Sequence, residues 1–141
     1  MFLDASVVAA VLLQEEDGPA FLKAMEAARG GLRYSPIVRL EATLALVRKR
    51  VERRGKGPAT AEDFAAATDL VDELLKALEA KEMHITGSMG AEAIRALSVY
   101  GKVVGHPAQL NMGDALSYAC AKAFHVPLLY KGDDFSKTDL A

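Results

Sequence analysis

Residues 2–13 read FLDASVVAAVLL, in which two apolar residues and an aspartate precede a longer apolar run. We interpret residues 2–3 as a short strand that ends at Asp4, followed directly by a helix that begins near Ser6. A buried strand that passes straight into a helix is typical of proteins with a parallel sheet. This stretch therefore predicts a fold in which helices pack against a parallel sheet.

The same alternation continues along the chain. Ser35-Pro36 is a strong helix start, because serine caps the first turn and proline suits the first helical position. Thr60 is a second cap. Further helices are predicted over residues 20–29, 36–54, 91–100 and 111–124, and further strands over residues 32–34, 82–86 and 127–130. In the helix over residues 91–100, Ile94 and Leu97 are expected to face inward. The fold class is therefore α/β, a three-layer α/β/α domain with a short central parallel sheet, and residues 1–141 form one domain.

Composition narrows the function classes. The chain has 17 basic and 19 acidic residues and a net charge of -2, so it is not a generally basic protein that coats nucleic acid. The apolar run Val7–Leu13 is too short to span a bilayer, and no basic residue precedes Asp4, as a secretory signal would require. A single cysteine, Cys120, leaves no internal disulfide and no cysteine zinc site. We expect a cytoplasmic protein.

Acidic residues follow the first and the last predicted strands. Asp4 ends the first strand, and Asp133 and Asp134 come after the last. Ligands of open parallel sheets bind outside the carboxyl ends of the strands, so these side chains could meet at one edge. For Asp4, capping of the following helix is an equally good explanation.

Glu41 lies within the apolar arc of its predicted helix, close to the direction of Ile37. A carboxylate in that position is costly unless it is paired, hydrogen-bonded or bound to a metal. The alternatives are a salt bridge with Arg48 or a position at the water-exposed edge of the arc.

Asp114 lies three residues after Asn111, a spacing that caps a helix as well as it serves a site. Gly113 favours a site, since a residue without a side chain lets another group approach closely. Separated carboxylates at one edge would repel one another, and a hard divalent cation would relieve that repulsion. Oxygen-only ligation suits Mg²⁺ or Mn²⁺, which can activate water and hold a phosphate.

Four stretches together resemble the motifs of PIN-domain ribonucleases, and the last two resemble the VapC toxins of bacterial toxin–antitoxin pairs. In order they are FLDAS at residues 2–6, SPIVRLEA at 35–42, GHPAQLNMGDALSYA at 105–119 and PLLYKGDDFSKTD at 127–139. The resemblance covers nearly the whole chain. It implies a PIN-like fold and a Mg²⁺- or Mn²⁺-dependent endoribonuclease that cuts RNA by water attack on a phosphodiester.

The resemblance also implies the site. Asp4, Glu41 and Asp114 match the acidic triad, and Asp134 matches the fourth acid. Asp133 occupies a position that is often Asn in the family and could still reach a metal through water. Ser6 and Asn111 match supporting polar residues. The family further implies a homodimer and a cognate antitoxin that covers the site.

Other interpretations remain open. A PIN-like module could bind RNA or protein without cutting, although all four acids are present. A receiver-type phosphoacceptor needs an acidic pair after the first strand and an aspartate after the middle one, and both are missing here. Six of the 17 basic residues fall within nine positions, which favours a solvated helix end for most of them and RNA phosphate contacts as the alternative; they are Arg48, Lys49, Arg50, Arg53, Arg54 and Lys56.

Overall fold

The computed structural model describes residues 1–140 and has at its centre a four-stranded parallel sheet in the order β3-β2-β1-β4. The strands are β1 (Phe2–Leu3), β2 (Arg33–Tyr34), β3 (Lys81–Glu82) and β4 (Leu128–Leu129). Strand β1 is central: Phe2 pairs with Arg33 on one side and with Leu128 on the other. The α/β class and the parallel sheet expected from the sequence are therefore confirmed.

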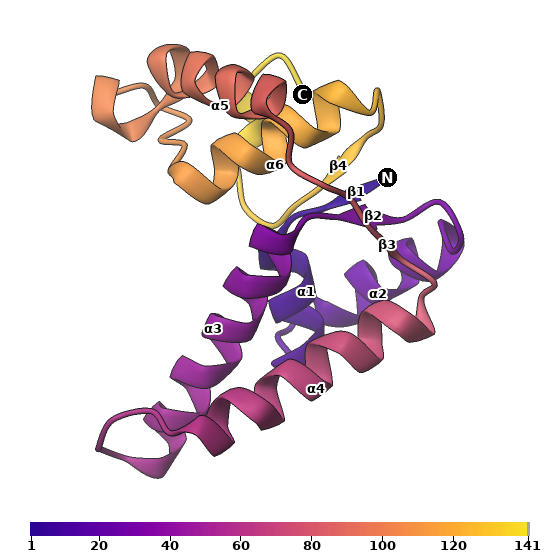
Figure 1. Cartoon of the computed structure of the whole chain (residues 1–141), viewed down its shortest axis with the longest axis vertical. Coiled ribbons are helices and arrows are strands. Elements are labelled where there is room, and N and C mark those ends of the chain that lie inside the picture. Colours follow the sequence, from indigo (N-terminus) through magenta and orange to yellow (C-terminus); the bar gives the residue numbers. More distant parts are fainter. Residues whose placement is uncertain (141) are drawn as a thin grey trace.

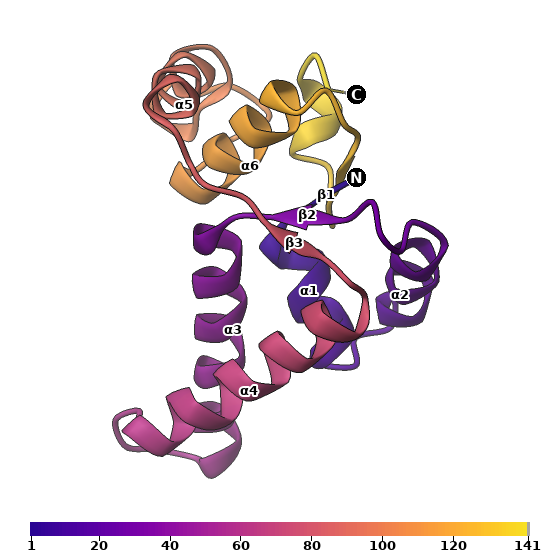
Figure 2. The ribbon, with the colours of Figure 1, turned by 45° about the vertical axis from the view of Figure 1, so that its right-hand side comes forward.

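Helices cover both faces of the sheet (Figures 1 and 2). Four lie on one face, and the other two lie with the C-terminal segment on the opposite face. The first group is α1 (Ala5–Leu12), α2 (Gly18–Ala27), α3 (Pro36–Arg54) and α4 (Ala61–Ala77). The second group is α5 (Gly87–Tyr100) and α6 (Met112–Ala123), with 3-10 turns η1 (Lys102–Val104) and η2 (Phe135–Lys137). No helix within residues 1–140 is long and apolar enough to cross a membrane.

Local chemistry explains where the long helices begin and end. The Ser35 hydroxyl accepts a hydrogen bond from the Val38 amide, and Pro36 opens α3 as expected. Gly55, with φ of 97°, ends that helix in a conformation that side chains disfavour. Thr60 caps α4 in a reciprocal box with Asp63. Helices α3 and α4 thus form a hairpin that projects from the sheet (Figure 1).

Three sequence-based boundaries are corrected. The strand predicted over residues 82–86 begins one residue earlier and is shorter, since β3 covers only Lys81–Glu82. Helix α5 begins at Gly87 instead of residue 91, because the Thr86 hydroxyl accepts from the Met89 amide and caps it. Helix α2 begins at Gly18, two residues before the predicted start.

The prediction for Ile94 is wrong, since this side chain points outward and is 72% exposed. The buried face of α5 consists instead of Met89, Ala93 and Ala96, and these include the small residues that let α5 pack closely on α6. Leu97 does pack against the core as expected. Cys120 is fully buried there as a small apolar group.

Candidate active site

The fold brings the predicted acids to the carboxyl edge of the sheet. Asp4 directly follows β1, and Asp134 follows β4, which pairs with β1. Glu41 lies in the second turn of α3, the helix that follows β2. Asp114 is in the first turn of α6. Four segments that are far apart in sequence therefore contribute to one region.

Asp4 is the most firmly held of these acids. It is 7% exposed, and hydrogen bonds reach both of its carboxylate oxygens. The Ser6 amide and hydroxyl donate to Oδ2 at 3.0 and 2.6 Å, so Asp4 does cap α1. The Ser117 hydroxyl of α6 donates to Oδ1 at 2.8 Å. Three donors fix the carboxylate in one orientation.

Ser6 also links Asp4 to the turn that carries Asp134. Its hydroxyl accepts a hydrogen bond from the Lys131 amide at 3.1 Å while donating to Asp4. The Lys131 ammonium in turn pairs with Glu15 and Asp17, in the connection between α1 and α2. The turn after β4 is therefore tied to the protein through both the backbone and the side chain of Lys131.

Glu41 and α6 approach each other closely at Gly113. A Cβ atom placed on Gly113 would overlap both Glu41 carboxylate oxygens and lie 2.6 Å from its Cδ. The carboxylate therefore occupies the space that a side chain at position 113 would fill. The suggested salt bridge with Arg48 is not formed, although the Arg48 charge does lower the pKa of Glu41.

Burial and mutual repulsion make two of the acids weak. Burial and the charges of Asp4 and Asp114 raise the pKa of Glu41 to about 7. Burial and the charges of Asp4 and Asp134 raise the pKa of Asp114 to about 6, although a hydrogen bond from the Asn111 amide acts in the opposite direction. The negative charges of the neighbouring acids repel those of Glu41 and Asp114, which makes the ionised forms of these two side chains less favourable.

Asn111 and Asp114 form the capping box expected as the structural alternative. The Asn111 side-chain oxygen accepts from the Asp114 amide at 2.9 Å, and Asp114 Oδ2 accepts from the Asn111 amide at 3.0 Å. Asp114 Oδ1 takes no protein hydrogen bond from residues 1–140. Capping and a role in the site are therefore compatible.

Comparison with known proteins agrees with this geometry. The family model described as "PIN domain" matches residues 1–140. A VapC ribonuclease of Rhizobium meliloti (strain 1021) is 45% identical over 140 residues, which are 99% of this chain and 98% of that protein. The chain is a PIN-domain protein of the VapC ribonuclease family. The resemblance drawn from its motifs is confirmed, and with it a hydrolase that acts on phosphodiester bonds.

VapC proteins of lower sequence identity also align with this chain over most of their length. Ribonuclease VapC28 of Mycobacterium tuberculosis (strain ATCC 25618 / H37Rv) is 33% identical, with 98% of this chain and 93% of that protein aligned. The crystal structure of Mycobacterium tuberculosis VapC20, titled a sarcin-ricin loop cleaving toxin, superimposes with a TM-score of 0.64. It is 17% identical, and the match covers 96% of this chain and 92% of that one. That likeness supports the fold.

The donor chemistry of this VapC site fits a hard divalent cation. All four acids offer oxygen, and the raised pKa values of Glu41 and Asp114 reflect burial first and then the negative charge of neighbouring acids, which a cation would neutralise. Within residues 1–140, no three acidic, histidine or cysteine side chains converge closely enough to hold a metal ion by themselves. The fit is therefore to an ion such as Mg²⁺ that keeps several of its waters and binds through one or two carboxylates.

The two neighbouring acids after β4 differ in their relation to the rest of the VapC site. The charge of Asp134 contributes to the raised pKa of Asp114. Both side chains are exposed, and the Asp133 backbone carbonyl accepts hydrogen bonds from the Ser136 amide and hydroxyl at 3.2 and 2.6 Å. The effect of the Asp134 charge on Asp114 is what separates the two acids, and the choice of Asp134 as the fourth acid stays a prediction.

Sequence reasoning missed Ser117. Its partner Asp4 lies 113 positions away, so no local pattern joins them. The available signal is its position one turn after Asp114, as a fully buried hydroxyl among alanines and other apolar residues of α6. Buried hydroxyls require a partner, and the carboxyl edge of the sheet offers one.

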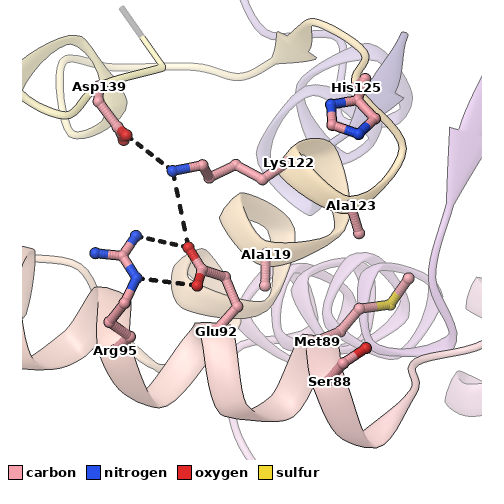
Figure 3. Close-up of a pocket in the computed structure, with 9 residues that line it drawn as sticks. All are labelled: Ser88, Met89, Glu92, Arg95, Ala119, Lys122, Ala123, His125 and Asp139. Atoms are coloured by element: carbon pink, nitrogen blue, oxygen red, sulfur yellow. Dashed lines mark hydrogen bonds and ion pairs between the residues drawn. The ribbon is translucent and has the colours of Figure 1, made fainter.

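A cavity of about 590 Å³ lies elsewhere, between α5 and α6 (Figure 3). Its charged groups satisfy one another: Glu92 pairs with Arg95 and Lys122, and Lys122 pairs with Asp139. The Tyr118 hydroxyl donates to Asp139 at 2.7 Å and joins the same network. The network anchors the C-terminal segment to α5 and α6 and adds nothing to the acidic site.

Proposed function

We propose that this protein is a Mg²⁺- or Mn²⁺-dependent endoribonuclease with Asp4, Glu41, Asp114 and Asp134 as its catalytic and metal-binding acids. The observation that carries the proposal is that the ends of β1 and β4, the second turn of α3 and the first turn of α6 bring these four acids to one edge of the sheet. Membership of the VapC ribonucleases supports RNA as the substrate.

Each acid has a distinct part in this mechanism. Asp4 is held in one orientation by Ser6 and Ser117, so its carboxylate is presented to a ligand in a fixed position. Burial raises the pKa values of Glu41 and Asp114 in the metal-free protein, and a bound cation would favour the ionised form of both. Asp134 adds a fourth charge from the turn that Lys131 ties to Ser6.

A bound divalent cation would supply two things that the chain lacks, activation of water and neutralisation of phosphate charge. Of Asp4, Glu41, Asp114 and Asp134, one or two would bind it directly and the others would reach it through its waters, as Asp133 could also do. Asn111 keeps Asp114 in place through the capping box. Chelation by EDTA is expected to abolish cleavage.

The paired substitutions Asp4→Asn and Asp133→Asn test this assignment. Asp4→Asn removes a buried charge from the site, so initial rates of RNA cleavage at saturating Mg²⁺ should fall by orders of magnitude. Asp133→Asn should be mild, because the family resemblance implies that Asn is tolerated at this position.

Thermal melting without metal shows that each variant is folded. Near-native cleavage by Asp4→Asn would reduce Asp4 to a helix cap and overturn the site assignment, whereas no cleavage by the unaltered protein would favour a binding module that does not cut. Equal damage from Asp133→Asn would move the fourth acid one residue earlier.

We also propose that the protein acts in the cytoplasm as a homodimeric toxin, neutralised by a cognate antitoxin. VapC membership supports the antitoxin, and the acidic edge suits an inserted arginine, whose planar fork matches paired carboxylates. A complex in which the antitoxin leaves Asp4, Glu41, Asp114 and Asp134 uncovered would contradict this mode of inhibition.

A further inference from the structure

The free end of the α3–α4 hairpin concentrates positive charge. We call Arg48, Lys49, Arg50, Arg53, Arg54 and Lys56 together the basic tip. The tip lies at the end of the hairpin farthest from the sheet (Figures 1 and 2). Residues 48–63 carry these six cations and only three carboxylates, in a chain whose net charge is -2. The local charge is therefore opposite to that of the whole molecule.

A carboxylate beneath the surface orders part of the tip. Asp63 is 1% exposed and accepts hydrogen bonds from Arg54 Nη1 and Nη2, both at 2.9 Å, and from Arg50 Nε at 3.2 Å. Both arginine side chains remain more than 40% exposed. Their guanidinium groups are thus held in place at the surface, so these side chains lose less conformational entropy when they bind an anion.

Three other cations of the basic tip are available to a ligand. Arg48, Arg53 and Lys56 are exposed, and none has a carboxylate within 4 Å among residues 1–140. Arg53 lines a hollow of about 360 Å³ together with Arg50, Arg54 and Asp63. Cations are favourable at a helix C-terminus, but that effect requires only the last turn, whereas the tip extends over two turns of α3 and into the loop.

Helix α3 connects the tip rigidly to the acidic site. From Glu41 to Arg54 the helix rises about 20 Å at 1.5 Å per residue. Arg48 lies two turns after Glu41 on the same face of the helix and is close enough to act on its charge. A chain of phosphates that enters the acidic site could pass Arg48 and continue to the tip.

We propose that the basic tip is a second contact surface for the RNA substrate and holds its sugar–phosphate backbone from about 10 Å (Arg48) to about 20 Å (Arg54) along α3 from Glu41. The inference rests on the proposed function, which supplies the polyanion. The tip itself contains no aromatic residue and offers charge and hydrogen-bond donors, while the neighbouring Phe64 of α4 is 41% exposed. Recognition by the tip is therefore of the backbone, and any stacking on Phe64 would also be independent of base sequence.

The test compares Arg53→Ala/Lys56→Ala with the control Lys23→Ala/Lys76→Ala. Both pairs remove two exposed cations that have no ion-pair partner among the described residues, but the control pair lies away from the tip. Each protein is assayed on a long single-stranded RNA and on one of about four nucleotides, which is too short to bridge the two surfaces.

On the long RNA, the tip variant should show a KM raised about tenfold and a shallower salt dependence, by about 1.4 in the slope of log K against log salt for two lost phosphate contacts. Its kcat, its activity on the short RNA and all properties of the control pair should stay unchanged. In EDTA, binding of the long RNA measured by fluorescence anisotropy should weaken by the same factor.

The outcomes separate the two proposals. An unchanged KM and unchanged binding for the long RNA would overturn the contact surface, as would equal losses on both substrates. Weakened antitoxin binding with unaltered RNA binding would assign the tip to a protein interface instead. If the unaltered protein cleaves neither RNA, the proposed function fails, and the anisotropy measurement still decides whether the tip binds RNA.

Discussion

At the scale of single residues, the acidic site depends on Gly113, which has no side chain. The Glu41 carboxylate occupies the space that a Cβ atom at this position would fill. The small residue beside Asp114 was expected to admit another group, and the structure identifies that group as Glu41. The spacing between α3 and α6 is thus set by a glycine and a carboxylate in contact.

We predict that Gly113→Ala inactivates the nuclease without unfolding it. The new methyl group would overlap the Glu41 carboxylate, which would have to move out of the site. A displacement of about 1 Å in a positioned group can reduce a rate about 100-fold. The change should be measured as the initial rate of RNA cleavage at saturating Mg²⁺, with thermal melting as the check on folding.

Gly90→Ala is the matched control, because Gly90 is also helical and a Cβ there meets nothing within 4 Å. It should retain full activity and gain up to about 1 kcal/mol in the free energy of unfolding from the better helix propensity of alanine. Full activity of Gly113→Ala would show that Glu41 does not need its observed position.

At the scale of elements, Asp4 is the point at which α1, α6 and the turn after β4 are joined. Ser6 donates from α1 and accepts from the Lys131 amide, and Ser117 donates from α6. A buried carboxylate that loses a donor is destabilised, and its orientation is no longer fixed.

We predict that Ser117→Ala lowers the free energy of unfolding by about 1–3 kcal/mol, because it removes a hydrogen bond to a buried charge. Cleavage should fall about tenfold, as is usual when a group that orients a metal-binding side chain is lost. Ser98→Ala is the control, since that exposed helical serine bonds only to the Arg95 carbonyl. Apparent Mg²⁺ affinity from the rate against metal concentration should weaken in Ser117→Ala alone.

Much of the element pattern could be predicted because its signals are local. Ser35, Thr60 and Asn111 cap helices where the sequence places them, since a cap depends on residues within one turn. Local reasoning was wrong at Ile94, because it assigned the larger apolar residue to the core. In α5 the neighbouring helix approaches so closely that Ala93 and Ala96 fill the contact.

The candidate site divides in the same way. The acids lie where the strand ends and the motifs predicted, but their assignment to catalysis stays a prediction. The contact between Gly113 and Glu41 and the bond from Ser117 to Asp4 depend on how α6 packs against α3 and β1. No pattern within a helix specifies that packing, so these partners become visible only in the folded structure.

At the scale of the whole molecule, the site makes stability depend on pH. The pKa values of Glu41, about 7, and Asp114, about 6, lie above the values near 4 that unfolded carboxylic acids have. Between about pH 4 and pH 7 the folded chain therefore binds more protons than the unfolded chain, and lowering the pH stabilises it. Four carboxylates whose hydrogen-bond partners lower their pKa values act in the opposite direction, but only below about pH 5, where their unfolded forms take up protons; they are Asp63, Asp72, Glu92 and Asp139. Burial also lowers the pKa of the Met1 amino group, which opposes the trend near pH 8.

We predict that the metal-free protein melts at a higher temperature at pH 5.5 than at pH 8. Glu41→Gln should remove most of that difference and raise the melting temperature at pH 8, where the native carboxylate is charged. Melting curves in EDTA at the two pH values, for both proteins, are the measurement. A melting temperature that rises with pH in the unaltered protein would contradict the raised pKa values.

The place of β4 in the sheet has a consequence for synthesis. Strand β1 is made more than 120 residues before its partner β4 and the turn with Asp134. Until the ribosome reaches residue 114, the nascent chain has Asp4 and Glu41 but lacks Asp114 and Asp134. The proposed site therefore becomes complete only when Asp134 has been added and β4 has paired with β1, so the order of residues along the gene delays the proposed activity relative to the synthesis of its first two acids.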